Sequence, residues 1–436
     1  MNFSDPIHSA IGLTHASPNA QFIGSASQHE LIVRLSSNVQ VIRLYDCLDI
    51  IHSFSWSPDS LYIMCLLKKR CIVQVFSIEN PEWTCKVDEG SAGLLSAAWA
   101  PDSQHFLTTT EFYIRINVWS LSEVSVCYLK HAKACSGNFA FSPGGRYLAL
   151  LERRSFHDYL SIFDCRADWN LLRNFQLDTH DSDGLLWSPD GRYLVIWDGC
   201  LHYRAAVYTL DGRHLHTFSA YEPGRDFLGI KSVCWSPTGQ LLAIGSYDQK
   251  CRILNHFNWS CLASLAHPVD QSINPYLGLG PSGRVLHLDD NIGPGVSDHP
   301  LHNYRPHRVD VYEEVRHEQQ AQSVAYCLRS EPITIQSIRV DPKLPFPKVG
   351  IGLVAFSSDG RYLATRNDNA PHVVWLWSID HRISLFSLLV HTSGPVRSLA
   401  WDSSSPARLA LCTASDCFFM WTPQGCLVVQ RQAAPG

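Results

Sequence analysis

One glycine-rich stretch has the spacing that can hold the phosphates of a dinucleotide. Residues 278–283 read Gly-Leu-Gly-Pro-Ser-Gly and match the pattern Gly-x-Gly-x-x-Gly. That pattern binds a pyrophosphate only where it joins a strand to the start of a helix, and no strand-turn-helix pattern surrounds Pro281. We therefore expect an irregular loop here and no nucleotide cofactor.

Histidines gather in the same region and raise the question of a metal site. They are His287, His299, His302, His307 and His317. No two of them have the spacing by which one helix or hairpin would share a metal ion, and no cysteine pair accompanies them. The sequence also lacks a Gly-x-Ser-x-Gly nucleophile pattern, since the nearest string, residues 90–93, has the wrong spacing. We expect no metal, no cofactor and no catalytic residues, and so predict that the protein is not an enzyme.

The sequence does repeat a turn between two strands. The fullest copy is Trp187–Leu194, WSPDGRYL, in which Pro189 fixes the first corner and Asp190 and Gly191 tolerate the tighter second corner. This pattern predicts a β-hairpin. Further copies, some degenerate, begin at Ser17, Trp56, Trp99, Phe141, Trp235, Phe356 and Trp401.

The spacing of these turns predicts the fold. The prolines at positions 18, 58, 101, 143, 189 and 237 are 40, 43, 42, 46 and 48 residues apart, the period of a propeller blade. About 20 residues after each turn, an apolar strand ends in an aromatic or aliphatic residue and a small polar one, as at Val118-Trp119-Ser120. We predict an all-β protein, a β-propeller with a single ring of seven to eight four-stranded blades and one long irregular insertion. In the seven-bladed alternative, the first copy serves only as a closing strand.

The repeats also divide the chain. We assign residues 1–266 to blades one to six, 267–348 to an insertion rich in proline and histidine, 349–430 to blades seven and eight, and 431–436 to a tail. The insertion is expected to be mostly irregular, with one alternating piece, Pro332–Ile338, that could form an edge strand.

Composition excludes several classes of partner. The formal net charge of -5 argues against a dominant electrostatic grip on nucleic acid or on the acidic microtubule surface. No apolar run approaches the roughly 18 residues of a membrane span, and the first residues lack a secretory pattern. We expect a soluble protein with no membrane insertion, and reduced thiols at the fifteen scattered cysteines.

Binding residues are expected where loops emerge from the blades. The loops from second to third strand and from fourth to first strand leave one face of a propeller, and loops on a rigid scaffold are where binding residues collect. On this face we select as candidate protein-binding residues Asp88, Glu89, Glu111, Arg153, Arg154, Arg366 and Asp368. Each taken singly is better explained as a solvated tip or a structural turn residue, and only as a set do they suggest a docking surface. Arg146, Arg192 and Arg361, just after the turns, mark the opposite face as the alternative.

Four strings go beyond the general repeat. They are residues 80–94, 109–112 and 245–256, and the stretch from Gly350 to Asn369. In these the chain resembles the WRAP-type WD-repeat family of centrosomes and spindle poles, the family of WD repeat-containing protein eight. The likeness runs from about Glu30 to Val429. The opening repeat departs from the family pattern, and the chain stops where that pattern continues.

The resemblance implies a function. It implies a non-catalytic scaffold in the cytoplasm and cytoskeleton, at the centrosome or microtubule organising centre and the spindle pole. The implied partners are a coiled-coil SSX-interacting anchoring protein and, in some lineages, a minus-end-directed kinesin. The implied roles are anchoring of microtubule minus ends, spindle organisation and cilium assembly. The alternative is a substrate-receptor propeller of a ubiquitin ligase, although neither Trp197-Asp198 nor Trp401-Asp402 has the Arg two residues on that such receptors show.

Overall fold

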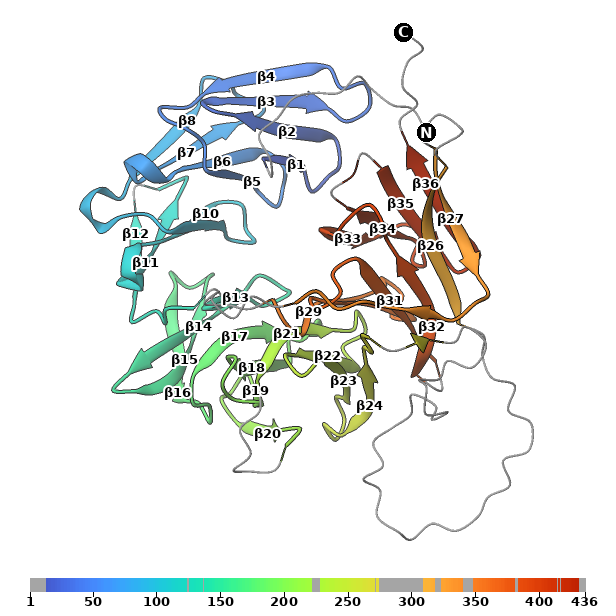
Figure 1. Cartoon of the computed structure of the whole chain (residues 1–436). Coiled ribbons are helices and arrows are strands. Elements are labelled where there is room, and N and C mark those ends of the chain that lie inside the picture. The colour runs from blue at the N-terminus through green and yellow to red at the C-terminus, as the bar shows by residue number, and fades with distance from the viewer. Residues whose placement is uncertain are drawn as a thin grey trace. The chain divides into compact units, whose positions relative to one another are not determined.

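The computed structural model describes residues 13–123, 125–135, 137–221, 228–270, 272–273, 309–317, 323–339, 348–380, 383–413, 415 and 417–430. The chain divides into two compact units. Most strands of both units are labelled in Figure 1. Unit 1 comprises Met1–Asp178 and Asp183–Trp187, and unit 2 comprises Thr179–Ser182 and Ser188–Gly436. No helix among the described residues is long and apolar enough to cross a membrane.

Unit 1 contains four sheets, each of four antiparallel strands in chain order. The strands are β1 (Thr14–Ala16), β2 (Phe22–Ser27), β3 (Glu30–Leu35) and β4 (Val41–Asp46); β5 (Ser53–Trp56), β6 (Tyr62–Leu67), β7 (Ile72–Ser77) and β8 (Thr84–Asp88); β9 (Ser96–Trp99), β10 (His105–Thr109), β11 (Arg115–Ser120) and β12 (Val126–Lys130); and β13 (Phe139–Phe141), β14 (Tyr147–Arg154), β15 (His157–Asp164) and β16 (Asn170–Gln176). Residues 183–187 of β17 (Ser182–Trp187) also belong to unit 1.

Unit 2 continues the same pattern. Its strands are β18 (Tyr193–Asp198), β19 (Ala205–Thr209) and β20 (His214–Phe218); β21 (Ile230–Trp235), β22 (Leu241–Ser246), β23 (Lys250–Asn255) and β24 (Cys261–Ala266); β29 (Ile351–Phe356), β30 (Tyr362–Asn367), β31 (Val373–Ile379) and β32 (Ile383–Val390); and β33 (Ser398–Trp401), β34 (Leu409–Cys412), β35 (Cys417–Thr422) and β36 (Gly425–Gln430). The predicted all-β, four-stranded repeat is confirmed.

Where a serine follows the aromatic residue of a turn, its side chain closes the hairpin; the copies at Trp99 and Trp401 have Ala100 and Asp402 instead. Ser57 is fully buried; its hydroxyl donates to Asp59 and accepts from the backbone N–H of Tyr62 at 2.9 Å. Ser188 makes the same pair of contacts with Asp190 and Tyr193. A buried hydroxyl that is fully satisfied locally fixes the register of the two strands, which explains why serine precedes the proline.

Most of the turn tryptophans link their sheet to the preceding one, and Trp235, whose indole N–H has no hydrogen-bond partner among the described residues, is an exception. In unit 1, the indole N–H of Trp56 donates to the carbonyl of His15 at 3.1 Å, and that of Trp99 donates to Ser55 at 3.2 Å. Trp187 donates to Ala140 at 3.0 Å. Since each bond runs from one first strand to the first strand of the preceding repeat, the repeated tryptophan both fills the core and sets sheet-to-sheet spacing.

The structure decides between the alternatives for the first copy and shows strands within the insertion. The degenerate first copy is a complete four-stranded sheet, β1–β4, and not a single closing strand. The range 267–348, expected to be mostly irregular, contains β25 (Ser272–Ile273), β26 (Asp310–His317), β27 (Ser323–Arg329) and β28 (Ile333–Thr334). The expected edge strand is present in part, because β28 pairs with β25.

The β26–β27 hairpin enlarges a sheet of unit 2. β26 pairs in parallel with β32, which gives the order β27-β26-β32-β31-β30-β29. Val309 and Val311 are buried in the core beside Leu388 and Trp375. This pairing joins segments about 77 residues apart in the chain, at Asp310 and Ser387, and so no local pattern predicts it.

Candidate protein-binding rim

The loops from second to third strand and from fourth to first strand emerge at the same end of each sheet, which we call the rim. In unit 1 the rim holds Asp88, Glu89, Glu111, Arg153 and Arg154, and in unit 2 it holds Arg366 and Asp368. A partner can bind such residues only through groups that the fold leaves exposed. We therefore take each in turn.

Two rim loops of unit 1 touch at Glu111. This residue begins the 3₁₀ helix η3 (Glu111–Tyr113), and its side chain lies over Gly93, where an added Cβ would come within 2.5 Å of Glu111 Cγ. Gly93 also has a φ of +70°, so glycine is required on both counts. Asp88 is exposed and accepts the backbone N–H of Gly90 at 2.9 Å. Asp88 and Glu111 therefore remain available at the surface.

Glu89, in contrast, is part of the core. Its side chain is buried and accepts from the Thr108 hydroxyl, from Asn117 Nδ2 at 2.5 Å and from the Trp119 indole at 2.9 Å. A buried carboxylate with three donors is structurally satisfied. Glu89 thus holds the loop after β8 against β10 and β11.

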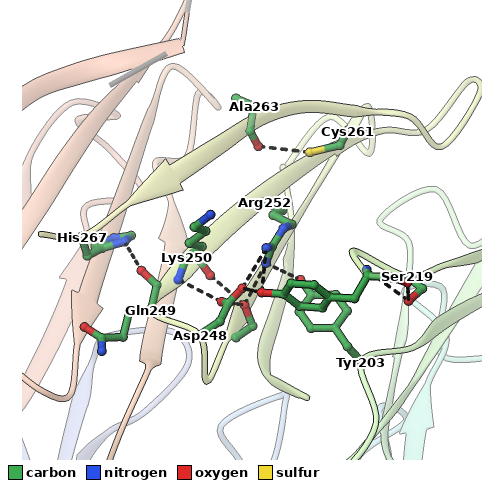
Figure 2. Close-up of polar contacts among 11 residues, drawn as sticks. Tyr203, Ser219, Asp248, Gln249, Lys250, Arg252, Cys261, Ala263 and His267 are labelled. Carbon is green, nitrogen blue, oxygen red and sulfur yellow. Dashed lines mark hydrogen bonds and ion pairs between the residues drawn. The ribbon is translucent and has the colours of Figure 1, made fainter. Parts of the chain in front are cut away.

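His267 occupies the same place in unit 2, directly after a fourth strand. It is buried, with Nε2 2.6 Å from the Thr365 hydroxyl, which also accepts the Trp377 indole N–H at 2.8 Å. Its Nδ1 lies 3.3 Å from the carbonyl of Gln249 (Figure 2). Burial lowers the pKa of His267 to about 3, so the ring is neutral. The residue after the fourth strand is therefore a structural position, filled by either side chain.

The two rim arginines of unit 1 are paired within the β14–β15 hairpin. Arg153 Nη1 lies 3.1 Å from Asp158 Oδ1, and Lys133 Nζ lies 2.8 Å from the other oxygen of Asp158. Arg154 forms an ion pair with Glu152. Asp158 and Glu152 are buried, whereas each arginine is partly exposed. The main role of these arginines is to neutralise buried carboxylates, and only part of each side chain is accessible to a binding partner.

The rim pair of unit 2 is likewise internal. Arg366 Nη2 lies 2.8 Å from Asp368 Oδ1, and Lys231 Nζ lies 2.7 Å from Asp368 Oδ2. Arg366 also donates to the carbonyl of Val396. Both side chains of the Arg366–Asp368 pair are less than one fifth exposed, so they fix the β30–β31 turn.

A buried ion pair stabilises the neighbouring rim turn of unit 2 (Figure 2). Arg252 Nη2 lies 2.8 Å from Asp248 Oδ2, and the guanidinium sits over the rings of Tyr203 and Tyr221 at 5.0 and 5.4 Å. Burial would raise the pKa of Asp248, but the charge and hydrogen bond of Arg252 outweigh it and hold that pKa below its usual range. The turn aspartate is therefore structural.

Sequence reasoning missed the apolar side chains at the tips of the unit 1 rim. Phe112 is 88% exposed, Ile114 62% and Phe156 90%. Phe112 and Phe156 both have positive φ, at 56° and 67°. Phe156 and Ser155 form the two-residue turn between β14 and β15, where asparagine and glycine are favoured. A bulky aromatic residue in this conformation is strained and solvated, which fold stability alone does not explain.

The signal for these tips lies in the turn chemistry. The string Arg153-Arg154-Ser155-Phe156-His157 joins two strands without a glycine, so one bulky residue must adopt the left-handed conformation. Of the seven selected residues, Asp88 and Glu111 are exposed, Arg153 and Arg154 are exposed but pair with buried carboxylates, and Glu89, Arg366 and Asp368 are largely covered and have internal partners. Their role in protein binding stays a prediction.

Comparison with known proteins shows the family. The WD domain, G-beta repeat, matches residues 212–255. The chain is 43% identical over 99% of its length to WD repeat-containing protein WRAP73 of Mus musculus, covering 88% of that protein. An uncharacterised WD repeat-containing protein of Schizosaccharomyces pombe is 25% identical over 71% of this chain and 56% of its own.

One solved structure is a β-propeller. The Cps50 (Swd1) β-propeller domain of Myceliophteria thermophila gives a TM-score of 0.40 at 15% identity, covering 60% of this chain and 88% of that domain. The repeats of four antiparallel strands and the extended identity to the mouse protein support the same family assignment. The chain belongs to the WD-repeat β-propeller family of WD repeat-containing protein WRAP73.

Proposed function

We propose that the protein is a non-catalytic scaffold of the centrosome and spindle pole that helps to anchor microtubule minus ends. In this proposal it binds a coiled-coil SSX-interacting anchoring protein, and in some lineages a minus-end-directed kinesin, and it serves spindle organisation and cilium assembly. The observation that carries the proposal is the 43% identity to WRAP73 across nearly the whole chain, together with the strings that resemble the centrosomal family.

The exposed rim tips of unit 1 supply a docking surface for such a partner. A coiled-coil helix presents an apolar stripe flanked by charged residues. Phe112, Ile114 and Phe156 are exposed apolar groups, with Glu111 and Arg154 beside two of them in the chain. Exposed aromatic side chains surrounded by charged groups are the usual centres of binding energy at interfaces.

The net charge of the protein favours attachment to microtubules through an adaptor over direct binding. A formal net charge of -5 opposes the acidic microtubule surface. We expect that the purified protein alone does not sediment with microtubules at physiological salt, and that it does so once the coiled-coil partner is added. Strong, salt-sensitive sedimentation of the protein alone would contradict adaptor-mediated attachment.

Affinity capture from cells, followed by binding of purified proteins, tests the proposal. We expect the tagged chain to capture the SSX-interacting coiled-coil protein and to locate at the centrosome and spindle poles. Capture of a ubiquitin-ligase scaffold in its place, with no centrosomal location, would overturn the proposal. A Phe257→Gly variant is the matched control for substitutions of Phe112 and Phe156. Phe257 is 86% exposed but lies in a turn between third and fourth strands, away from the rim loops.

A further inference from the structure

Unit 1 contains a cavity of about 660 Å³ at the end of its sheets opposite the rim. It lies between the sheet β9–β12 and the sheet β13–β16, and its wall is formed by the turn after β9, by the β11–β12 connection and by the β15–β16 connection. Its volume falls within the roughly 300 to 1,000 Å³ of binding pockets. None of the chemistry proposed for the rim uses this cavity.

The cavity wall carries an excess of negative charge. Three carboxylates line it, Asp102, Glu123 and Asp168, against the guanidinium of Arg166 and the imidazole of His105. Asp102 is already engaged, because its Oδ2 lies 2.7 Å from Nδ1 of His105. Glu123 and Asp168 are exposed, and neither forms an ion pair within the part of the chain that the structure describes. These two carboxylates can therefore accept a cation from outside.

A buried donor in the same wall has no acceptor. Trp169 is 6% exposed and lines the cavity, and its indole N–H has no hydrogen-bond partner among the described residues. The ring is held edge to face against His105 and Phe141, at centroid distances of 5.7 and 6.2 Å. A buried N–H without an acceptor is unfavourable, and a hydrogen bond to a ligand carbonyl would offset that cost.

The backbone beside this donor is also unusual. Asp168 and Trp169 are consecutive residues with φ of 50° and 57°. Aspartate tolerates this conformation better than tryptophan does. The turn thus places a carboxylate and an indole side by side in one wall of the cavity.

We propose that this cavity binds a basic peptide segment of a partner protein. An arginine or lysine side chain of the segment enters between Glu123 and Asp168, and a main-chain carbonyl of the segment accepts from the indole of Trp169. Arginine is favoured, because its planar fork can bond two carboxylates at once. The same acidic wall disfavours phosphate groups and acidic peptides.

Fluorescence anisotropy with a labelled Gly-Arg-Gly-Arg-Gly peptide at 150 mM salt tests this site in the full chain. We expect saturable binding, which is lost when citrulline replaces both arginines, since citrulline keeps the shape but not the charge. The variant Glu123→Gln with Asp168→Asn should weaken binding at least tenfold, and asparagine keeps the turn because it tolerates positive φ.

The matched control removes two exposed carboxylates elsewhere in unit 1. Glu79→Gln with Glu82→Gln changes the net charge equally, and it should leave the affinity within twofold of the natural chain. Equal losses in the two double variants, or equal binding of the arginine and citrulline peptides, would overturn the proposal. So would the absence of any saturable binding of the arginine peptide.

Discussion

Arg153 Nη1 and Asp158 Oδ1 lie 3.1 Å apart, one cross-strand pair away from the hairpin turn that exposes Phe156. Asp158 is 1% exposed and also contacts Lys133, so the hairpin is fixed to the loop after β12. The charges of the rim therefore position the tip, and the apolar side chain at the tip is the group that a partner can reach.

The double reversal Arg153→Glu with Arg154→Glu should destabilise unit 1. The structure places each arginine beside a buried carboxylate, Asp158 or Glu152. Glutamates at these two positions would remove the cations that pair with the buried carboxylates and would place further negative charge beside them. We expect the free energy of unfolding to fall by roughly 1 to 3 kcal/mol after allowance for partial exposure. Chemical denaturation measures the loss.

The control for this reversal is Arg192→Glu with Arg361→Glu. These arginines are 77% and 81% exposed and lie 3.6 and 3.8 Å from their turn aspartates. Their reversal should cost less than about 1 kcal/mol. An Arg153–Arg154 reversal as mild as this control would show that the hairpin does not depend on those ion pairs.

Trp187→Ala should unfold part of unit 1. Trp187 is 5% exposed and donates to the carbonyl of Ala140. Its removal leaves a cavity and an unpaired carbonyl, which should lower the free energy of unfolding by about 3 to 5 kcal/mol. Asp190→Ala removes only turn contacts to Ser188 and Arg192 and should cost far less. Thermal melts of the two variants provide the comparison. Native stability of Trp187→Ala would contradict its role as the link between sheets.

The stability of unit 2 should fall with pH below about 6.5. The pKa of His267 is about 3 in the fold, against about 6.5 when unfolded. Between these values the unfolded chain binds a proton that the folded chain does not, so stability is complete above pH 6.5 and is lost on acidification. The loss from this group is about 2 kcal/mol by pH 5. Urea denaturation at pH 7 and pH 5 measures it.

Comparison with His267→Gln isolates this effect. Glu314 acts in the same direction but at lower pH. Burial would raise its pKa, but the nearby His391 ring and the hydrogen bonds from Ser393 outweigh burial and lower that pKa to about 2. We expect the difference between pH 7 and pH 5 to shrink in His267→Gln and to persist in the exposed control His29→Gln. An unchanged difference in His267→Gln would show that another group is responsible.

The repeat was predictable because the residues of each turn determine the conformation of that turn locally. Pro189, Asp190 and Gly191 define a hairpin locally, and the period of the copies then gives the four-stranded sheets. The degenerate first copy was harder to recognise, because no Asp-Gly follows its proline. The structure nevertheless shows the same hairpin contact, in which Ser17 Oγ accepts the backbone N–H of Phe22 at 2.9 Å.

The pairing of the rim charges was not predictable. Whether Glu89 is solvated or buried depends on Thr108, Asn117 and Trp119, which come from two later strands. The rim pattern in the sequence identifies loops, but it does not tell which loop charges face inward. The exposed Phe156, in contrast, is inferable from a two-residue turn that lacks glycine.

Phe156→Gly should stabilise the fold. Phe156 is 90% exposed, so it contributes little packing, and its φ of 67° costs a non-glycine residue about 1 kcal/mol. Calorimetry should show a raised midpoint of thermal unfolding. A lowered midpoint would mean that the ring packs against the fold and that its exposure is not a functional feature.

The most direct measurement for the proposed rim is the dissociation constant between the full chain and the purified SSX-interacting coiled-coil protein. We predict that Phe112→Gly with Phe156→Gly weakens binding at least about tenfold, as expected for aromatic anchors, while the thermal midpoint is unchanged or higher. The Phe257→Gly control should bind as the natural chain does. Natural affinity in a folded Phe112–Phe156 double variant would contradict the assignment of the unit 1 rim as the docking surface.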